Sequence, residues 1–578
     1  MAHYDMIIKN GTIVDGTRTP RYQSDLAIKE GKIAKIGGLK SATADKVLDA
    51  NGLIVAPGFV DLHTHFDAQY FWDPYCTMSG WHGVTSVAIG NCGCGFGFAP
   101  SRPEDRERAM QSMTRNEAIP LACMQEGMGP KWDWITFPEF MDSLDRTPKG
   151  VNCLTYVPLT PLYTWVMGWD EAKKRRPTKE EMDQMVALVN EGMDKGACGW
   201  SAQVLGPNSV QRDFDGTPMV TDLMTEEEIL TFAQILADRD EGFIELGYQE
   251  TGEEGNRMES ETMKFFEKVA EVAKRPVLYQ TVTTDDTNPE QHRGRLRWLE
   301  ECAKKGLRMH GQGQTFDAIM ELTFEDWNLF DATQGWRNVT VGNHEERIAA
   351  MQNPEFRQIL KDEHEQDILP RGILPGSYPN LVVGEVSDLK FEKYTGLTVG
   401  QIADMENKHV VDAILDLAVG DDLQTAFIAY RGRTNPELIM EVVDSPYTVA
   451  GISDGGAHVK FSTAGIFPTH MLTWLVRDEQ RLTLEDAHYK LSYLPAFMGG
   501  FQDRGFIREG VAADIVVYDL ENLKATEPEV LHDLPGGEWR RVQKAEGYRW
   551  TIVNGEVTFE DGVTTGATPG KLLRHGRG

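Results

Sequence analysis

Apolar and polar residues alternate at both ends of the chain, and short glycine turns interrupt the alternation. This pattern covers residues 4–14, 25–36, 510–519 and 550–559. Alternation broken by glycine turns is typical of antiparallel hairpins. We therefore predict that the two ends of the chain form halves of one small β-domain.

The middle of the chain follows a different pattern, in which short apolar runs are separated by segments with helical spacing. The predicted strands begin near residues 59, 84, 151, 197, 243, 277, 307 and 447. Thr178 with Glu181, and Thr225 with Glu228, have the spacing of capping boxes at the start of two helices. Strands that alternate with helices indicate a parallel sheet, and eight of them suit a (β/α)8 barrel.

The last two predicted strands are separated by far more chain than an ordinary connection needs. We interpret residues 315–445 as a large insertion. Helical patterns at 345–361 and 399–417 and apolar strands at 381–386 and 425–430 lie within it. It could serve as a lid over the barrel or as a contact between subunits.

Composition narrows the classes of partner. The chain of 578 residues has a net charge of −31, so it repels phosphate backbones and is not expected to bind nucleic acid. No run approaches 18 apolar residues, and the first residues lack the pattern of a signal peptide. Seven cysteines in this length do not suggest a disulfide framework. We expect a cytoplasmic protein that does not bind membranes, acts on a small molecule, and is compatible with a homo-oligomer.

Candidate metal ligands stand where two of the predicted strands end. His63 and His65 share one face of the first strand, because alternate residues of a strand point the same way. Cys92 follows the second strand. Two imidazoles and a thiolate at strand ends suit zinc. The competing interpretation is chance, since roughly one chain of three with this histidine content would carry such a pair.

The stretch from Pro57 to His65 resembles the first barrel strand of the amidohydrolase superfamily. Gly90-Asn91-Cys92-Gly93 narrows the resemblance to the D-aminoacylase (N-acyl-D-amino-acid deacylase) branch, and Ser453 to His458 agrees with it. In that branch, a cysteine after the second strand takes the bridging-ligand place. The resemblance implies a TIM-like barrel over residues 58–507 and a β-sandwich built from residues 1–57 and 508–578.

The same resemblance implies a set of site residues. The metal ligands would be His63, His65, Cys92 and Asp454, with zinc as the metal. One zinc per chain is favoured, and two are an alternative. Asp454 would also be the catalytic residue, taking a proton from the attacking water and delivering it to the leaving nitrogen.

The chain departs from the branch at two strands. D-aminoacylases carry a histidine at the end of strand five and another at the end of strand six, but the corresponding runs here, residues 243–248 and 278–283, have none. Candidate replacement ligands, or residues supporting the ligands, are Glu245, His310, His344, His458 and Asp67. No substrate-binding residue can be named, although Arg431 and Arg433 are candidate partners for an anion.

These observations favour a metal-dependent hydrolase of a carbon–nitrogen bond other than a peptide bond, most like N-acyl-D-amino-acid deacylase. Hydrolysis of a cyclic amide, imide or lactone is an alternative that uses the same chemistry. A metal-dependent C–C hydrolase or lyase is a second alternative. The loss of the two histidines also leaves open a barrel that has lost catalysis and serves only to bind.

Overall fold

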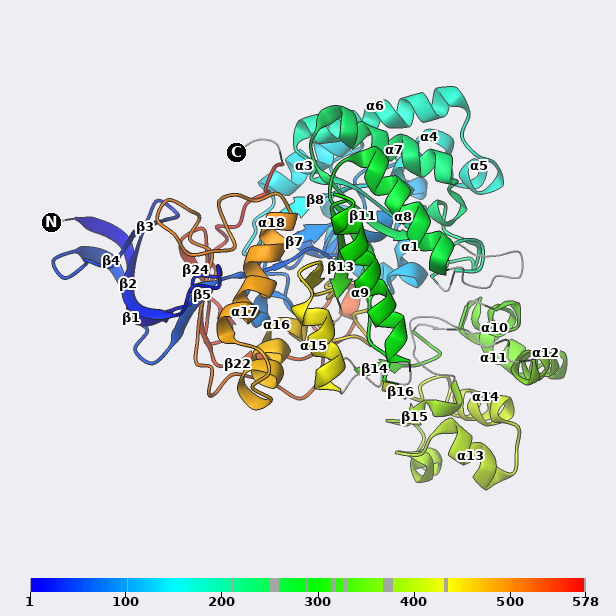
Figure 1. Ribbon diagram of the computed structural model, residues 1–578. Coiled ribbons are helices and arrows are strands. Elements are labelled where there is room, and N and C mark those ends of the chain that lie inside the picture. Colours follow the sequence, from blue (N-terminus) through cyan, green and yellow to red (C-terminus); the bar gives the residue numbers. More distant parts are fainter. Residues whose placement is uncertain are drawn as a thin grey trace.

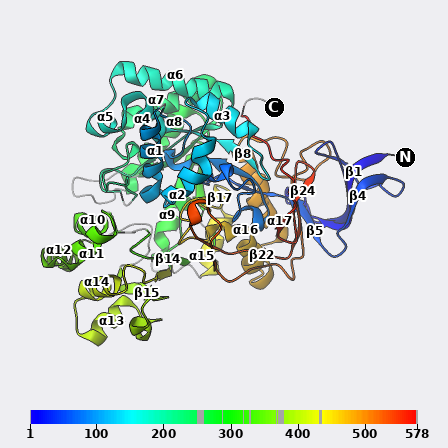
Figure 2. The same ribbon diagram turned by 180° about the vertical axis from the view of Figure 1, so that it is seen from behind.

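The computed structural model describes a mixed α/β protein (Figures 1 and 2). The described residues are 2–100, 102–209, 211–248, 259–286, 288–313, 315–316, 319–326, 330–331, 333–366, 368, 378–430 and 435–575. Within these ranges, no helix combines the length and the hydropathy that crossing a bilayer requires. The structure has three parts: the sheet shared by both ends, the parallel strands with their helices, and the insertion.

Both ends of the chain contribute to a nine-stranded sheet within the described residues, at the left of Figure 1. Its N-terminal strands are β1 (His3–Ile13), β2 (Tyr22–Lys29), β3 (Lys32–Ile36), β4 (Thr43–Asp49) and β5 (Ile54–Pro57). Its C-terminal strands are β18 (Ile515–Tyr518), β23 (Tyr548–Val553), β24 (Glu556–Glu560) and β25 (Val563–Thr564). The two groups meet where β5 pairs antiparallel with β18, with Val55 opposite Val517.

The strands predicted in the middle of the chain are present and pair in parallel. They are β6 (Phe59–Asp61), β7 (Val84–Ile89), β8 (Asn152–Thr155), β9 (Val157–Pro158), β10 (Gly199–Val204), β11 (Phe243–Tyr248), β12 (Val277–Val282), β13 (Met309–Gly313) and β17 (Thr448–Ala450). In the described chain they form a sheet in the order β6-β7-β8 and another in the order β17-β13-β12-β11-β10-β9. Only Tyr156 separates β8 from β9, and a parallel bridge joins Thr64 to Gly455 beyond β6 and β17. The carboxyl ends of these strands therefore lie together.

Helices cover the parallel strands. Both predicted capping boxes are confirmed: Thr178 begins α6 (Lys179–Lys195) and Thr225 begins α7 (Glu226–Arg239). Their apolar faces join the large core around the strands. The other helices of this part are α1 (Pro103–Asn116), α2 (Leu121–Cys123), α3 (Phe137–Arg146), α4 (Leu159–Met167), α5 (Trp169–Lys174), α8 (Glu259–Ala273), α9 (Pro289–Lys304), α15 (Pro436–Asp444), α16 (Phe467–His470), α17 (Leu484–His488) and α18 (Leu494–Met498).

The chain between β13 and β17 builds a separate group of elements with its own apolar core, at the lower right of Figure 1. Strands β14 (Ile319–Leu322), β15 (Val382–Val383) and β16 (Phe427–Tyr430) form an antiparallel sheet. The helices are α10 (Gln334–Thr340), α11 (His344–Gln352), α12 (Pro354–Glu365), α13 (Val399–Glu406) and α14 (Val410–Gly420). Each of the two helices predicted in this segment, at residues 345–361 and 399–417, is therefore divided into two helices in the structure. The first divides at Asn353-Pro354, because proline lacks the N–H that a helix interior needs, and the second at Asn407, which is left-handed.

Candidate metal centre

The loops after β6 and β7 bring together the three residues singled out first. His63, His65 and Cys92 each offer a ligand atom, and these atoms lie within 4.8 Å of one another. All three side chains are buried. These three residues lie close together because β6 pairs in parallel with β7, which places the ends of the two strands side by side.

The turn that carries Cys92 is held from several sides. Cys92 has a left-handed backbone, with φ of 55°, and its N–H donates to Glu245 Oε2 at 2.9 Å. Asp67 Oδ2 accepts from the N–H of Gly90 at 3.1 Å. Left-handed backbone is costly for a residue with a side chain, so surrounding contacts must fix it. Asp67, one of the candidate supporting residues, therefore holds the turn that carries Cys92.

Six residues place atoms that could bind a metal within 4 Å of one another in succession, and we call this set the row. Its members are Cys92, His63, Asp454, His65, Glu117 and His458. Cys92 Sγ is 3.4 Å from His63 Nε2, which is 3.2 Å from Asp454 Oδ1. Asp454 Oδ1 is 3.8 Å from His65 Nε2, which is 3.5 Å from Glu117 Oε2. Glu117 Oε2 is in turn 3.8 Å from His458 Nε2. The row thus contains the four ligands predicted from the sequence, together with His458 and with Glu117, which was not foreseen.

Three further side chains, from Gln312, Glu245 and Gln280, contact His63 and Cys92 of the row. The free ring nitrogen of His63, Nδ1, is 2.9 Å from Gln312 Oε1 and 3.8 Å from Glu245 Oε1. Gln280 Nε2 donates to Cys92 Sγ at 3.4 Å. Because a hydrogen bond to Nδ1 leaves Nε2 to face the row, Gln312 sets the tautomer that a metal ligand needs. Glu245 therefore lies behind the row, next to His63 and Cys92.

Burial and neighbouring charges separate the pKa values of the two strand-end histidines. Burial lowers the pKa of His63, but the carboxylate of Asp454 outweighs it and the pKa rises to about 9. Burial, together with the nearby charge of His63, lowers the pKa of His65 to about 3. Burial also raises the pKa of Asp454, but His63 reverses this and holds it below its usual range.

Burial raises the pKa of the remaining acidic groups of the site. The pKa of Glu117 is raised to about 8 by burial and then by Asp454. Burial also raises the pKa of Glu245, and it raises that of the Cys92 thiol well above the ordinary value. A bound cation would lower these pKa values, because it stabilises the charged forms of thiolate and carboxylate ligands.

The residues of the row fit a zinc ion in their chemistry. Imidazole, thiolate and carboxylate are the ligands zinc takes in proteins. Among the described residues, Glu117 Oε2, Glu245 Oε1 and His65 Nδ1 are buried without a hydrogen-bond partner. Buried polar atoms are nearly always paired, so unpaired oxygens beside the row point to a missing positive partner.

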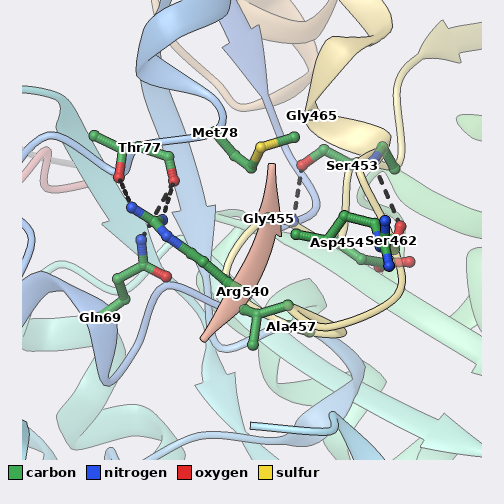
Figure 3. A pocket seen from close by; sticks show the side chains of 14 residues that line it. Gln69, Thr77, Met78, Ser453, Asp454, Gly455, Ala457, Ser462, Gly465 and Arg540 are labelled. Atoms are coloured by element: carbon green, nitrogen blue, oxygen red, sulfur yellow. Dashed lines mark hydrogen bonds between the residues drawn. The ribbon is translucent and has the colours of Figure 1, made fainter. Parts of the chain in front are cut away.

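A pocket adjoins the row at Asp454, whose side chain is 31% exposed (Figure 3). Residues 453–457 form one wall, and Gln69, Thr77 and Met78 lie across from them. Arg540 and Arg541 also line the pocket, and both come from β21 (Arg540–Val542), near the C-terminal end of the chain.

The two arginines are held differently. Arg540 donates to Thr77 O at 3.0 Å and pairs with Asp533 at 2.7 Å, so its fork is fully engaged. Arg541 Nη2 pairs with Glu321 of β14 at 2.9 Å. Its Nε is buried, and no described residue accepts a hydrogen bond from it. Arg541 therefore lines the same pocket as Asp454 and has one N–H group, at Nε, without an acceptor among the described residues.

Two of the candidate replacement ligands lie elsewhere. His310 precedes Gln312 by one pleat on β13, and the charges that act on it are those of Lys490 and Arg308. His344 begins α11, and its ring nitrogens contact Glu325 at 2.7 Å and Asp422 at 3.0 Å. None of these contacts is with a residue of the row. Arg431 and Arg433 lie outside the described residues.

Glu117 and Arg541 were not predicted, because no local pattern marks them, whereas the strand alternation predicts that Gln312 or His310 faces the site. Glu117 is the last residue in a polar run that ends α1. Gln312 and His310 share a face of β13, and alternation alone does not say where that strand ends. Arg541 lies in a segment more than eighty residues beyond Asp454. Only the folded arrangement brings these residues to the row.

Comparison with known proteins identifies the family of the chain. Residues 46–559 match the amidohydrolase family. D-aminoacylase of Alcaligenes xylosoxydans xylosoxydans is 25% identical over 583 residues, covering 99% of this chain and 97% of that protein. An uncharacterized protein of Mycobacterium tuberculosis is 26% identical over 609 residues, covering 99% and 96%.

Solved structures show the same fold. A crystal structure of D-aminoacylase superposes with a TM-score of 0.67 at 21% identity, covering 99% of this chain and all of that one. N-acyl-D-glutamate deacylase from Bordetella bronchiseptica, complexed with zinc and a phosphonate inhibitor, superposes with a TM-score of 0.66 at 20% identity, with the same coverage.

The chain belongs to the amidohydrolase family, because the match spans most of its length. Within the family it is D-aminoacylase-like, and it is a hydrolase of carbon–nitrogen bonds other than peptide bonds.

Proposed function

We propose that this protein is a zinc-dependent deacylase of N-acyl-D-amino acids. The observation that carries the proposal is the buried row at the strand ends, in which His63, His65, Cys92 and Asp454 lie beside a pocket that contains a spare arginine donor. The names of relatives similar over the full chain, D-aminoacylase and N-acyl-D-aspartate deacylase, support the substrate class. We also propose that the parallel strands close into a barrel, with the shared sheet as a β-sandwich domain.

His63, His65, Cys92 and Asp454 would hold the zinc. When bound, zinc polarises an amide carbonyl and lowers the pKa of a water to about 7. Asp454 is the member of the row that reaches the pocket. Its free oxygen accepts a proton from the attacking water. As the carbon–nitrogen bond breaks, Asp454 returns this proton to the leaving nitrogen, giving a carboxylic acid and a free amine.

Arg541 gives the pocket its preference for an anion. A substrate carboxylate that accepts from the guanidinium of Arg541 would make a charge-assisted hydrogen bond in a partly buried setting, where such bonds are strong. Arg540, fixed by Thr77 and Asp533, forms the floor beside it. The acyl amide would then extend from Arg541 toward Asp454.

The proposal is tested by metal content and activity on the same preparations. Purified protein is expected to contain zinc and to release amino acid from N-acetyl-D-amino acids faster than from the L-forms. His63→Ala should lose both zinc and activity, whereas His3→Ala, which removes an exposed histidine, should keep both. Native protein without zinc, unaffected by added zinc, would contradict the proposal. Turnover of cyclic amides in place of acyl amino acids would favour the alternative substrate class.

A further inference from the structure

The insertion supplies an acid to an arginine of the pocket. Glu321 of β14 faces Arg541 of β21, with its Oε1 atom 2.9 Å from Nη2 of the arginine. Arg541 lines the pocket together with Asp454. The guanidinium that the proposed function assigns to the substrate carboxylate is therefore already in contact with a carboxylate of the protein.

Backbone contacts hold the two partners in place. The N–H of Arg541 donates to the carbonyl of Val459 at 2.8 Å, and Val459 itself lines the pocket. The N–H of Glu321 donates to the carbonyl of Phe461 at 3.2 Å. Both partners are thus attached to one short stretch of chain, which continues the loop that carries Asp454. The pair is therefore built into the surroundings of the site.

Little water surrounds the pair. The side chains of Glu321 and Arg541 are each 15% exposed. Burial raises the pKa of Glu321, and Arg541 acts in the opposite direction because it favours the ionised carboxylate. In such a setting, charges a few ångströms apart interact far more strongly than in bulk water. The carboxylate of Glu321 therefore cancels much of the attraction that Arg541 would exert on an entering anion.

The neighbouring basic side chains are matched by acids in the same way. The pairs are Arg540 with Asp533 at 2.7 Å, Lys460 with Asp326 at 2.7 Å, and Arg541 with Glu321 at 2.9 Å. An anionic substrate thus approaches positive charges that are already balanced. Glu321 is the acid that balances the charge of Arg541.

We infer that Glu321 is a specificity-determining residue, which weakens the binding of the substrate carboxylate by competing with it for Arg541. The inference rests on the proposed function, which assigns that carboxylate to Arg541. A guanidinium has several N–H donors and can contact two carboxylates, but the two carboxylates repel each other. Glu321 therefore lowers the preference of the site for an acyl amino acid over an acyl amine.

The same competition acts on the product. Hydrolysis of an N-acyl amino acid gives a carboxylic acid and a free amino acid, and the amino acid keeps the carboxylate that Arg541 binds. A product held by an unbalanced, little-exposed guanidinium would leave slowly, because charge-assisted hydrogen bonds are strong. Glu321 thus favours release of the amino acid as well as limiting the affinity for the substrate.

Glu321→Gln separates charge from shape, because the amide has nearly the same size and keeps an acceptor oxygen but is neutral. Two constants should fall roughly fivefold or more, since a like charge is removed from beside the carboxylate. They are KM for the N-acetyl-D-amino acid that native protein hydrolyses fastest, and the inhibition constant of the free D-amino acid. KM for the N-acetylamine that lacks the carboxylate should not change. In Arg541→Met, the further change Glu321→Gln should leave all three constants unchanged.

The controls separate the charge beside Arg541 from the attachment of the insertion. Asp326→Asn removes another acid of the insertion, which pairs with Lys460, and should leave the three constants unchanged. If Glu321→Gln fails to fold, as judged by its thermal unfolding, Glu321→Asp withdraws the charge by one methylene group and should lower the first two constants by a smaller factor.

Two results would overturn the inference and leave the proposed function standing. One is an unchanged or raised KM for the N-acetyl-D-amino acid in a folded Glu321 variant. The other is an equal fall in KM when Arg541 is already methionine, because Glu321 would then not act through the arginine. Failure of native protein to hydrolyse any N-acyl-D-amino acid would overturn both the inference and the proposed function.

Discussion

At the scale of single residues, the site depends on a few side chains held in uncommon backbone. Cys92, Asp454 and His458 all have φ between 50° and 55°. Left-handed backbone costs on the order of 1 kcal/mol or more for residues other than glycine. Three such residues in one row indicate that the fold holds them for a purpose other than stability.

Replacing Arg541 tests its assigned role in binding the substrate carboxylate. Arg541→Met should raise KM for N-acyl-D-amino acids at least tenfold, because a hydrogen bond to a charged group contributes about 1.5 to 3 kcal/mol. It should leave KM unchanged for an N-acyl amine that lacks the carboxylate. Arg549→Met, which changes a half-exposed arginine away from the pocket, is the matched control. Equal effects on both substrates would contradict the assignment.

How far the sequence predicts the site depends on where each residue lies. His63, His65 and Cys92 could be placed because a strand fixes which residues share a face and where its end lies. Glu117 and Arg541 could not, because their roles come from contacts between segments far apart in sequence. Nor does the sequence decide whether His310 and His344, the candidate replacement ligands, reach the row. Alternation specifies a face, but not the depth of a residue along the strand.

At the scale of elements, the boundaries reflect local chemistry where it is strong. Capping boxes placed the starts of α6 and α7 correctly. The insertion helices were merged because apolar spacing continued across Asn353-Pro354 and Asn407. The ladders between strands, by contrast, depend on partners that no local pattern identifies.

One contact between elements sets up a dependence of stability on pH. Lys490, in η11 (Tyr489–Tyr493), is buried and donates to the carbonyls of Ser445 and Thr448, at the start of β17. Burial, and then Arg18, lower its pKa to about 7, while Asp444 and Asp486 act in the opposite direction. The folded state thus holds this proton less tightly than the unfolded chain does.

The unfolded lysine titrates near 10.5, so the unfolded state binds more protons between about pH 7 and 10.5. The contribution of Lys490 to the free energy of unfolding should therefore rise with pH across this window. At about 1.4 kcal/mol per pKa unit, native protein should gain roughly 2 to 3 kcal/mol relative to Lys490→Met between pH 7 and pH 9. Urea unfolding of both proteins at the two pH values measures the difference. A difference that does not change with pH would show that the amine stays charged in the fold.

At the scale of the whole molecule, negative charge is the dominant feature. The net charge of −31 makes the folded chain repel itself, and salt screens that repulsion. Raising NaCl from 0.05 M to roughly 0.5 M should therefore raise the Tm by a few degrees. Calorimetry at the two concentrations, repeated with KCl, checks this. A fall in Tm would mean that ion pairs between parts, such as Arg115–Asp331 and Lys460–Asp326, outweigh the repulsion.

The pairing of β5 with β18 joins strands that lie more than 450 residues apart in the chain. During synthesis, β1 to β4 can pair soon after they leave the ribosome, but one edge of β5 must wait until almost the whole chain has emerged. An unpaired edge is a template for wrong association. The nascent chain therefore carries an open edge through the entire synthesis of the catalytic part. Pairing of β18 with β5 covers this edge and removes the template.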